Sequence, residues 1–565
     1  MSAYADRPWL KLYDDHVDPD FLAPETSYLE LIERSFSDFA DRAALHFLGT
    51  TLSFRELDLA SRRFAAFLHA SGLEPGDVVG INMPNLPQYL IAQAGTLRAG
   101  CVANGVSPLL TPKEMAYQLN DNGAKALVTL DFIFAERVTK ISDKVPRLSH
   151  LIVANLADFL PWPKRTLGRL LKKVPSGKVT PLPGKTVLRF NEVMAKYPAQ
   201  APAVKLKPDD TCLVQYTGGT TGMPKGAELT HRNMVNNLMA VAQWGQTERG
   251  GEILISAFPF FHLAGLAYGL SGMAMGNTQI LIPDPRNIKH FISEFAKYRP
   301  TSVANVPSLY IMLMNDPAFK NLPFGQVKCY VSGAAPFAVE SFRSFERIVG
   351  EDKVLEVYGM TETSPIMTSN PLRGPKRIGS VGLPIQSTFI KLMDLETGTR
   401  EVQIGQEGEI VCRGPQVMKG YLNKPEETAH ALRQMEGGKW LYTGDVARMD
   451  EDGFLTIVDR AKDMLNVGGY KVFSREVEES LYQVPAIEFC AIVGVSHPDR
   501  PGSEVVKAVI QLKPAYQDQD RDAIEREIRQ YCEENMAPYK CPKSIEFTKA
   551  IPLTAVGKVD KKALR

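Results

Sequence analysis

The sequence predicts an α/β protein, in which a large N-terminal domain of βαβ-type parallel sheets carries a small β-rich subdomain and precedes a small α+β domain. Short apolar runs alternate with longer amphipathic stretches over the first two thirds of the chain, as in βαβ units. After about residue 377 turn signals separate strand-like runs, and after Arg460 helical and strand patterns mix. We therefore place the N-terminal domain at 1–460, its β-rich subdomain at about 378–460, and the C-terminal domain at 461–565.

The expected elements follow in a regular order. Runs rich in Val, Ile, Leu and Ala predict strands at 78–83, 126–129, 151–153, 278–282, 303–306 and 328–331. Amphipathic stretches predict helices at 88–97 and 309–313. Further strands are expected at 389–393, 408–413 and 454–458. The C-terminal domain should contain a helix at 474–482, strands at 489–495 and 505–512, and a helix at 520–535.

Residues 253–283 contain no Asp, Glu, Lys or Arg, so a membrane span is one interpretation of this segment. Pro259, four glycines and the polar run 277–279 interrupt it. Because such interruptions are typical of a strand, a helix and a strand in a core, we predict those three elements here.

The composition is that of an ordinary globular protein. The 565 residues are 44% hydrophobic and 23% charged, and a net charge of +1 gives no overall field for nucleic acid, so no nucleic-acid partner is expected. Seven cysteines without a C-x-x-C pair favour neither disulfides nor zinc. Since the N-terminus lacks an apolar signal core, we expect a cytoplasmic protein; the oligomeric state stays open.

The segment 161–178 is locally basic. Its cationic residues are Lys164, Arg165, Arg169, Lys172, Lys173 and Lys178, and apolar residues recur at helical spacing at Leu167, Leu170, Leu171 and Val174. A peripheral helix on a membrane surface has this pattern. A solvated basic helix that packs its leucines onto the domain has it too, and prolines at 161, 163 and 175 keep the helix short.

The loop 216–226, YTGGTTGMPKG, is the most informative segment. Its glycines let backbone N–H groups approach an anion, its threonine hydroxyls add donors, and Lys225 adds positive charge. Met223 and Pro224 separate Gly222 from Lys225, so this is not a Walker A sequence. A Gly/Thr-rich surface turn is the alternative, but the density of donors favours a phosphate site.

Four other segments carry residues suited to nucleotide chemistry: YGMTE at 358–362, YTGD at 442–445, DRAKDMLNVGGYKV at 459–472 and PLTAVGKVDKKALR at 552–565. Taken singly, each has an ordinary interpretation. Asp445 suits a turn, Arg460 and Lys558 suit a solvated surface, and His262 in FPFFHLAG suits a core. Only their combination points to one kind of site.

Together with the loop, these segments resemble the AMP-forming adenylate synthetases, which include acyl-CoA synthetases, firefly luciferase and nonribosomal-peptide adenylation domains. The resemblance covers nearly the whole chain. It is closest to bacterial long-chain fatty acid CoA ligases, through the second glycine of YTGGTTG, LTHRNM at 229–234 and GPQVMKGY at 414–421. It implies that a carboxylate attacks the α-phosphate of ATP, pyrophosphate leaves, and the thiolate of coenzyme A then displaces AMP.

The resemblance also implies roles for individual residues. The expected phosphate ligands are Thr217, Gly218, Gly219, Thr220, Thr221, Gly222 and Lys225, and the expected Mg²⁺ ligands are Thr217 and Glu362. Tyr358 should stack on adenine, Thr361 should contact the α-phosphate, and Asp445 should accept from the ribose. The remaining residues expected around the nucleoside are Gly333, Ala334, Gly359 and Arg460.

The resemblance further implies a mobile C-terminal domain that rotates between the two half-reactions about a hinge at Lys462. Lys558 would enter the site for adenylation and contact the acid carboxylate and the α-phosphate. After rotation, Gly468 and Gly469 would border the tunnel for coenzyme A, where a Cβ would obstruct the thiol.

His262 would orient the carboxylate or gate the thioester step. Leu266 stands where some long-chain members have a tryptophan gate, so a gate of that form is not expected. The apolar segments 263–275 and 306–312 suit an acid pocket and suit plain core equally. Chain length, a ring or a second carboxylate therefore cannot be read from the sequence.

We predict an ATP-dependent, AMP-forming acyl-CoA synthetase for a fatty or related carboxylic acid, with ATP, Mg²⁺ and coenzyme A. Alternatives are a ligase for a medium-chain, cyclic or dicarboxylic acid, an acyl-AMP ligase that loads a carrier protein, and a nucleotide-binding sensor. The GGYK segment at 468–471 and the lack of a carrier domain downstream favour free coenzyme A, and the presence of Thr217, Glu362 and Lys558 favours an enzyme.

Overall fold

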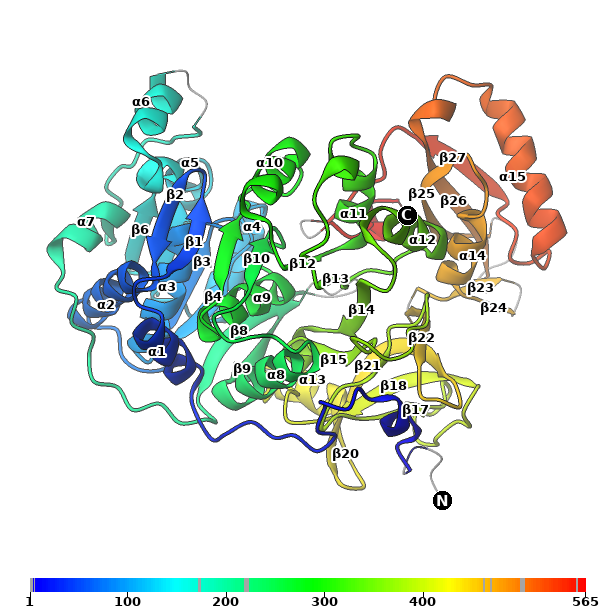
Figure 1. Cartoon of the computed structure of the whole chain (residues 1–565), viewed down its shortest axis with the longest axis horizontal. Helices are drawn as coiled ribbons and strands as arrows, with labels where there is room; N and C mark the ends of the chain where they lie inside the picture. The colour runs from blue at the N-terminus through cyan, green and yellow to red at the C-terminus, as the bar shows by residue number, and fades with distance from the viewer. Residues whose placement is uncertain are drawn as a thin grey trace.

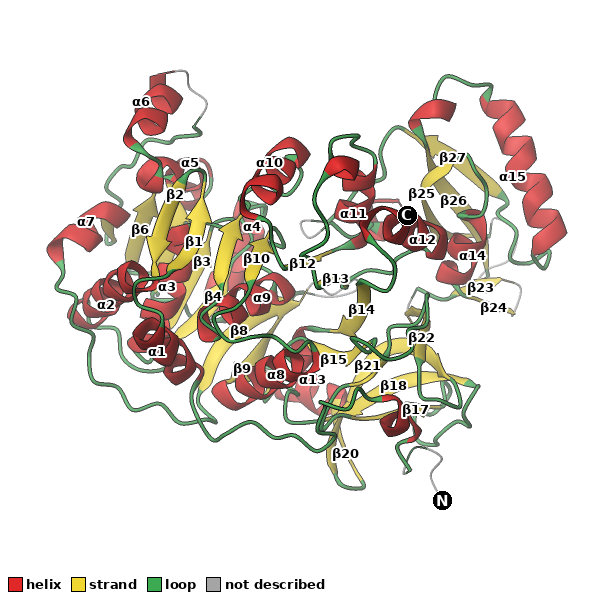
Figure 2. Ribbon diagram, viewed as in Figure 1, coloured by secondary structure: helices red, strands yellow, loops and turns green. Residues whose placement is uncertain are grey.

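The computed structural model describes residue 4 and residues 6–170, 174–217, 223–460, 463–467, 470–497, 503–554 and 557–564, without the side chains of 169 and 170. Figures 1 and 2 show two large sheets with helices around them, a third sheet below, and a small α+β unit at the upper right that contains the C-terminus.

The first large sheet has eight strands in the order β19-β9-β8-β4-β3-β5-β6-β7 among the described residues. Its central pairs are parallel, and β8–β9 and β9–β19 are antiparallel. The strands are β3 (Val78–Asn82), β4 (Val102–Gly105), β5 (Ala126–Leu130), β6 (His150–Ala154), β7 (Thr186–Arg189), β8 (Thr211–Thr217), β9 (Lys225–Thr230) and β19 (Gly420–Tyr421).

The second large sheet has nine described strands in the order β16-β15-β14-β13-β12-β10-β11-β1-β2. It is parallel from β14 to β1 and antiparallel at both edges. The strands are β1 (Ala43–Phe47), β2 (Thr50–Ser53), β10 (Ile253–Ser256), β11 (Thr278–Leu281), β12 (Ser302–Asn305), β13 (Cys329–Ser332), β14 (Val354–Gly359), β15 (Ile366–Ser369) and β16 (Leu383–Pro384).

Helices join the two sheets into one core. A single cluster of buried apolar side chains contains residues of β1, β3 and β5 together with helices of both sheets: α1 (Tyr28–Asp38), α2 (Phe54–Ala70), α3 (Pro87–Arg98), α4 (Pro112–Asp121), α5 (Asp131–Glu136), α7 (Phe190–Lys196), α8 (His231–Trp244) and α9 (Leu263–Ala274). A second cluster packs α10 (Ile288–Tyr298), α11 (Pro307–Met314) and α12 (Val339–Val349) against the nine-stranded sheet.

The third sheet is antiparallel, with five strands in the described part of the chain. Its strands are β17 (Phe389–Met393), β18 (Glu407–Arg413), β20 (Leu432–Met435), β21 (Gly438–Met449) and β22 (Leu455–Arg460), and α13 (Pro425–Ala431) precedes β20. The first residues of the chain complete its core, because Tyr4, Trp9 and Val17 are buried against this sheet.

As far as the C-terminal unit is described, it combines a β23–β24 hairpin with a sheet of β25, β26 and β27. Its elements are β23 (Leu465–Val467), β24 (Tyr470–Val472), α14 (Ser474–Leu481), β25 (Ile487–Ser496), β26 (Glu504–Leu512), α15 (Arg521–Asn535) and β27 (Ser544–Thr548). The apolar faces of both helices and the sheet form their own core. Contacts to the large body include Ser308 Oγ, which donates to the carbonyl of Gly557 at 2.9 Å.

The α/β fold class and each strand and helix expected from the sequence are confirmed, to within two or three residues at their ends. The uncharged segment 253–283 contains β10, α9 and β11, as predicted. The third sheet and the C-terminal strands fall inside the segments expected for them. Two short strands come from the segment expected to form the β-rich subdomain but belong to the large sheets. The strand β16 extends the nine-stranded sheet, and β19 pairs with the eight-stranded one. The domain limits themselves stay a prediction.

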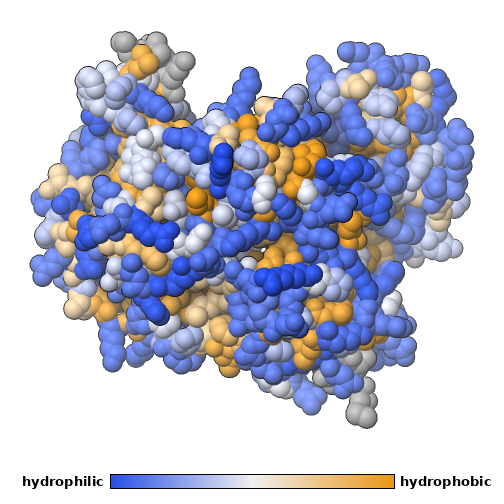
Figure 3. Space-filling model, viewed as in Figure 1, coloured by the Kyte–Doolittle hydropathy of each residue, from blue (hydrophilic) through white to orange (hydrophobic). Residues whose placement is uncertain are grey.

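The basic segment forms α6 (Trp162–Leu170), which stands at the edge of the molecule in Figure 1. Trp162 is 74% exposed and Leu167 is 55% exposed. Of the two alternatives, packing of the leucines onto the domain does not hold for Leu167; Leu170 and Leu171 fall outside the described side chains. Hydrophilic residues cover most of the face in Figure 3, with several separate hydrophobic patches. In the described part of the chain, no helix has the length and apolar character that a bilayer crossing requires.

Candidate active site

One cavity of about 760 Å³ collects the residues that the sequence singles out. It is lined from α8, α9, the nine-stranded sheet, the third sheet and the C-terminal unit. The predicted residues on its surface are Thr217, Lys225, His262, Gly333, Ala334, Tyr358, Gly359, Thr361, Glu362, Asp445, Arg460 and Lys558. Gly218, Gly219, Thr220, Thr221, Gly222, Lys462, Gly468 and Gly469 lie outside the described residues, so their predicted roles stay predictions.

A buried carboxylate, Asp445, organises one end of the cavity. Asp445 lies on β21 opposite Arg460 on β22, and the Arg460 Nε lies 3.0 Å from its Oδ1. The Tyr358 hydroxyl donates to its Oδ2 at 2.6 Å. Asp445 raises the pKa of Arg460, and burial followed by Asp445 raises the pKa of Tyr358. The carboxylate is therefore held in place by a cation and a neutral phenol, and the Tyr358 ring is fixed with it.

Glu362 is the second buried carboxylate of the cavity. It lies in a 3-10 turn, Thr361–Thr363, directly after β14 and is 4% exposed. The Tyr421 hydroxyl donates to its Oε1 at 2.7 Å. Burial raises the pKa of Glu362. Tyr421 was not assigned from the sequence, where it ends the run GPQVMKGY; the β19–β9 pairing brings it to Glu362.

Lys225, predicted to bind phosphate, lies beside Tyr421 and Glu427. Its ammonium forms an ion pair with the Glu427 carboxylate and lies 5.0 Å from the centre of the Tyr421 ring. Thr217, at the end of β8, donates to the carbonyl of Lys225 at 3.5 Å. Lys225 therefore lines the cavity with its charge paired to a carboxylate.

Two glycines are explained by close packing. A Cβ on Gly359 would collide with the carbonyl of Pro365, because β14 and β15 approach closely there. A Cβ on Gly333 would lie 2.8 Å from the side chain of Val357. At Gly333 the sequence suggested only that a small residue leaves space for a base, whereas the packing of β13 on β14 also requires glycine.

His262 caps the N-terminus of α9, with its Nδ1 accepting from the backbone N–H of Ala264 at 3.3 Å. In a neutral imidazole this bond leaves the proton on Nε2. The ring stacks on Phe258 at 5.5 Å and 8°. Burial and the nearby Lys558 lower its pKa to about 3. The imidazole is therefore neutral at physiological pH.

Lys558 reaches the cavity from the C-terminal unit. The bond between Ser308 Oγ and the Gly557 carbonyl anchors the turn that carries it. Burial, reinforced by the charge of Arg460, lowers its pKa to about 8. A buried ammonium beside a guanidinium favours an anion as its ligand.

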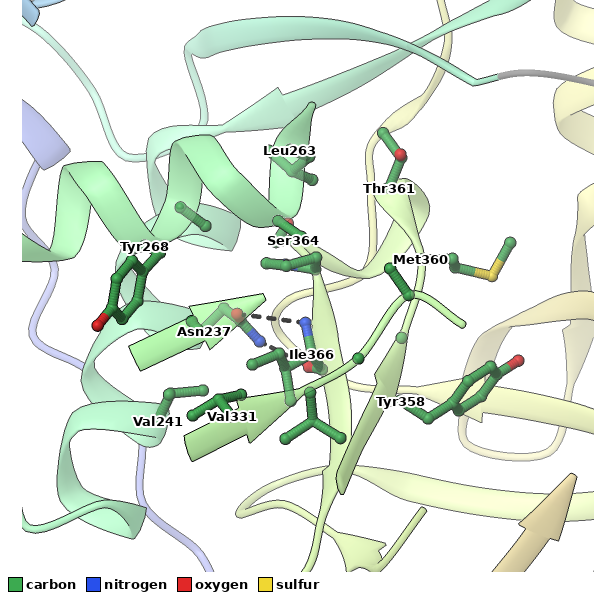
Figure 4. Close-up of a pocket in the computed structure, with 18 of the residues that line it drawn as sticks. Asn237, Val241, Leu263, Tyr268, Val331, Tyr358, Met360, Thr361, Ser364 and Ile366 are labelled. Atoms are coloured by element: carbon green, nitrogen blue, oxygen red, sulfur yellow. Dashed lines mark hydrogen bonds between the residues drawn. The ribbon is translucent and has the colours of Figure 1, made fainter. Parts of the chain in front are cut away.

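The other half of the cavity is an apolar channel between the nine-stranded sheet and helices α8 and α9. Figure 4 shows Val241, Leu263 and Val331 on its walls, with Tyr268 and Tyr358 toward opposite sides. Segment 263–275 lines it in part, as expected. Segment 306–312 does not, because Leu309 and Tyr310 are buried in the core on the other face of the sheet. Leu266 also lies in the core, away from the channel.

Comparisons with known proteins agree along almost the whole chain. The profile of the AMP-binding enzyme family matches residues 32–422, and that of the AMP-binding enzyme C-terminal domain matches residues 476–558. A long-chain-fatty-acid–CoA ligase of Bacillus subtilis (strain 168) is 36% identical, with 99% of this chain and 97% of the relative covered. One of Escherichia coli O157:H7 is 37% identical with the same coverage.

Among solved structures, the anthranilate CoA ligase AuaEII in complex with anthranoyl-AMP superimposes with a TM-score of 0.82. It is 27% identical, and the match covers 96% of this chain and 97% of that one. The shared architecture therefore includes both the large body and the C-terminal unit.

Proposed function

Because the chain belongs to the AMP-binding enzyme family, we propose that it is an acid–thiol ligase that uses ATP to convert a fatty or related carboxylic acid to its acyl adenylate and then to its coenzyme A thioester. The observation that supports this most strongly is the meeting of Glu362, Asp445 and Lys558 in one cavity from three distant segments. Each brings a charge that the two-step reaction needs.

The end of the cavity around Asp445 suits the nucleoside. A carboxylate with two oxygens accepts from the two ribose hydroxyls, and Arg460 holds it in place. Adenine would lie between the Tyr358 ring and the strand end at Gly333 and Ala334. Tyr358 donates its hydroxyl to Asp445, so its face is left for stacking.

The residues Glu362 and Thr217 fit a magnesium ion. Mg²⁺ takes hard oxygen ligands and keeps several waters, so one carboxylate and one hydroxyl suffice beside the phosphates. Burial raises the pKa of the Glu362 carboxylate, and a bound cation would favour its ionised form. When bound, the ion would neutralise charge on the phosphate oxygens and on leaving pyrophosphate. Tyr421 would hold Glu362 in the required orientation.

Lys558 supplies the charge at the reacting atoms. A carboxylate attacking the α-phosphate brings two anions together, and a preorganised ammonium lowers the cost of that approach. His262, neutral with its proton on Nε2, donates a hydrogen bond to the acid without repelling Lys558. General-base catalysis is not required of it, since the acid is already ionised.

For the second half-reaction we propose that the C-terminal domain, 461–565, rotates about a hinge at Lys462. Gly468 and Gly469 would then border the tunnel for coenzyme A. The present arrangement, with Lys558 in the cavity, suits the adenylation step.

The proposal is tested by incubating the protein with ATP, magnesium, coenzyme A and a panel of fatty, aromatic and dicarboxylic acids. AMP, pyrophosphate and acyl-CoA should form in equal amounts. ATP consumption without a thioester from any acid contradicts the proposal. Replacing coenzyme A by a phosphopantetheinyl carrier protein separates this activity from an acyl-AMP ligase, since the latter prefers the carrier.

Adenylation should lose efficiency as the pH rises through about 8. The pKa of Lys558 is lowered to about 8 from an ordinary 10.5, so the protonated form that binds anions disappears earlier than for an exposed lysine. The kcat/KM for ATP, which reports the free enzyme, should show this alkaline limb. In Lys558→Arg the fall of kcat/KM should occur at higher pH. If it occurs at the same pH as in the unaltered protein, a group other than Lys558 causes it.

We also propose that α6 makes peripheral contact with anionic membranes, as its exposed Trp162 and Leu167 beside basic residues suggest. Trp162→Ala/Leu167→Ala should weaken sedimentation with phosphatidylglycerol-containing vesicles by about tenfold, because two apolar side chains lose their burial. Leu109→Ala, which truncates another leucine that is 55% exposed, is the control. Equal binding by all three proteins would exclude contact through α6.

A further inference from the structure

The apolar channel ends at a charged pair that no predicted role explains. Glu252, Thr301 and Lys328 directly precede β10, β12 and β13, and all three line the cavity. The backbone N–H of Thr301 donates to the Ile253 carbonyl and that of Lys328 to the Thr301 carbonyl, each at 2.8 Å, so the three residues lie side by side. Because the strands are parallel, these residues lie at the N-terminal ends of the strands. Asn305 and Gly333 lie at the opposite, C-terminal ends, with the residues expected to bind the nucleotide.

The two side chains of the Glu252–Lys328 pair differ in their exposure to solvent. Lys328 Nζ lies 2.5 Å from Glu252 Oε1, and the Thr301 hydroxyl donates to Oε2 at 2.5 Å. The Glu252 side chain is 4% exposed, whereas that of Lys328 is 48% exposed. The buried carboxylate is thus satisfied by a cation that faces both the channel and the solvent. Lys328 therefore borders both the channel and the solvent at this end.

Two polar side chains on α9 beside the channel have hydrogen-bond partners within the protein. The Tyr268 hydroxyl donates to Ser302 Oγ at 3.1 Å, and Ser271 Oγ donates to the Tyr268 carbonyl at 2.7 Å. The walls between are apolar, with Val241, Ala267 and Val331 among them. This lining suits an alkyl chain. A second carboxylate at the far end would have to compete with Glu252 for the Lys328 ammonium.

On the basis of the proposed function, we propose that the Glu252–Lys328 pair is a gate at the far end of the acyl channel and sets the length of the acid. The acid's carboxylate meets Lys558 next to Ser308, just beyond β12. From Asn305 back to Thr301 the strand spans roughly 13 Å at about 3.3 Å per residue. An extended chain covers about 1.2 Å per bond, so a saturated acid of about 12 carbons reaches the pair.

A longer chain has to displace Lys328. The ammonium moves into water readily because half of its side chain is already there, but Glu252 stays buried without its cation. Leaving a buried carboxylate unpaired is unfavourable, so each further pair of carbons should bind less well until the gate is removed.

The experiment measures kcat/KM for octanoate, decanoate, dodecanoate, hexadecanoate and octadecanoate. In the unaltered protein the value should fall beyond dodecanoate. The double variant Glu252→Gln/Lys328→Ala removes both charges, so no unpaired carboxylate is left in the core. Its ratio of hexadecanoate to decanoate should rise by about tenfold, with the octanoate value unchanged within about threefold. Lys320→Ala, which removes an exposed lysine away from the cavity, should leave the whole profile unchanged.

Glu252→Gln alone gives a second test if the double variant does not fold, since glutamine preserves the volume and the bond from Thr301. It should raise the same ratio by about threefold. A profile without a fall beyond dodecanoate, or one that is identical in the variants, overturns the gate while thioester formation upholds the proposed function. No thioester from any of the acids overturns the proposed function, and the gate with it.

Discussion

Lys558→Ala should lower the rate of acyl-adenylate formation by about 10³-fold, the effect of removing one preorganised charge from a buried site. Thioester formation from supplied acyl adenylate and coenzyme A should change by less than about threefold, because in the proposed rotation of the C-terminal domain Lys558 leaves the cavity. The first rate is measured as ATP–pyrophosphate exchange, and the second as release of AMP from synthetic acyl adenylate.

The control for this variant is Lys562→Ala, which removes an exposed lysine four residues further on. It should leave both rates unchanged. If Lys558→Ala lowers both half-reactions equally, the lysine does not alternate between two states and the rotation proposed for 461–565 is wrong. An undiminished exchange rate would exclude Lys558 from the adenylation site.

Glu362→Gln should lower adenylation by about 10²-fold to 10³-fold and raise the magnesium concentration needed for half-maximal activity. Glutamine keeps the shape of the side chain and still accepts from Tyr421, so only the charge is lost. ATP–pyrophosphate exchange titrated with magnesium measures both effects. Because burial already disfavours the ionised carboxylate, the variant should unfold at the same temperature or a slightly higher one.

Glu426→Gln makes the same chemical change on the exposed surface of α13 and should leave the magnesium dependence unaltered. A Glu362→Gln protein that is inactive and also less stable would point to a structural carboxylate. A Glu362→Gln protein with the normal magnesium dependence would show that other residues bind the ion.

Much of the fold could be predicted because each apolar run is a local signal. Strands such as β3 and β5 are buried on both faces and read as continuous apolar sequence, so no distant information is needed to find them. Lys558 and Glu362 were found because each stands in a motif. Their meeting in one cavity required the whole fold, since Lys558 reaches it through a turn held by Ser308.

The features that sequence reasoning missed all depend on long-range contacts. Tyr421 meets Glu362 through a two-residue strand, and Glu427 meets Lys225 across the same junction. The Glu252–Lys328 pair joins residues 76 positions apart. Neither residue stands in a recognisable motif, and an isolated charge next to a strand normally signifies only the strand's end. The exposure of Leu167 could not be predicted either, because it depends on whether α6 packs against the rest of the protein.

The core of the third sheet includes Tyr4, Trp9 and Val17 from the beginning of the chain. This core therefore cannot be completed until residues far apart in the sequence have all been synthesised. Tyr4 donates its hydroxyl to the carbonyl of Val402 at 3.0 Å, across 398 positions. A ribosome that adds about 5–20 residues per second makes Val402 roughly 20–80 s after Tyr4. During that time Trp9 and Val17 have no sheet to cover them, although the strands between are already leaving the ribosome. Residues Tyr4 to Val17 are therefore synthesised well before the sheet that buries them.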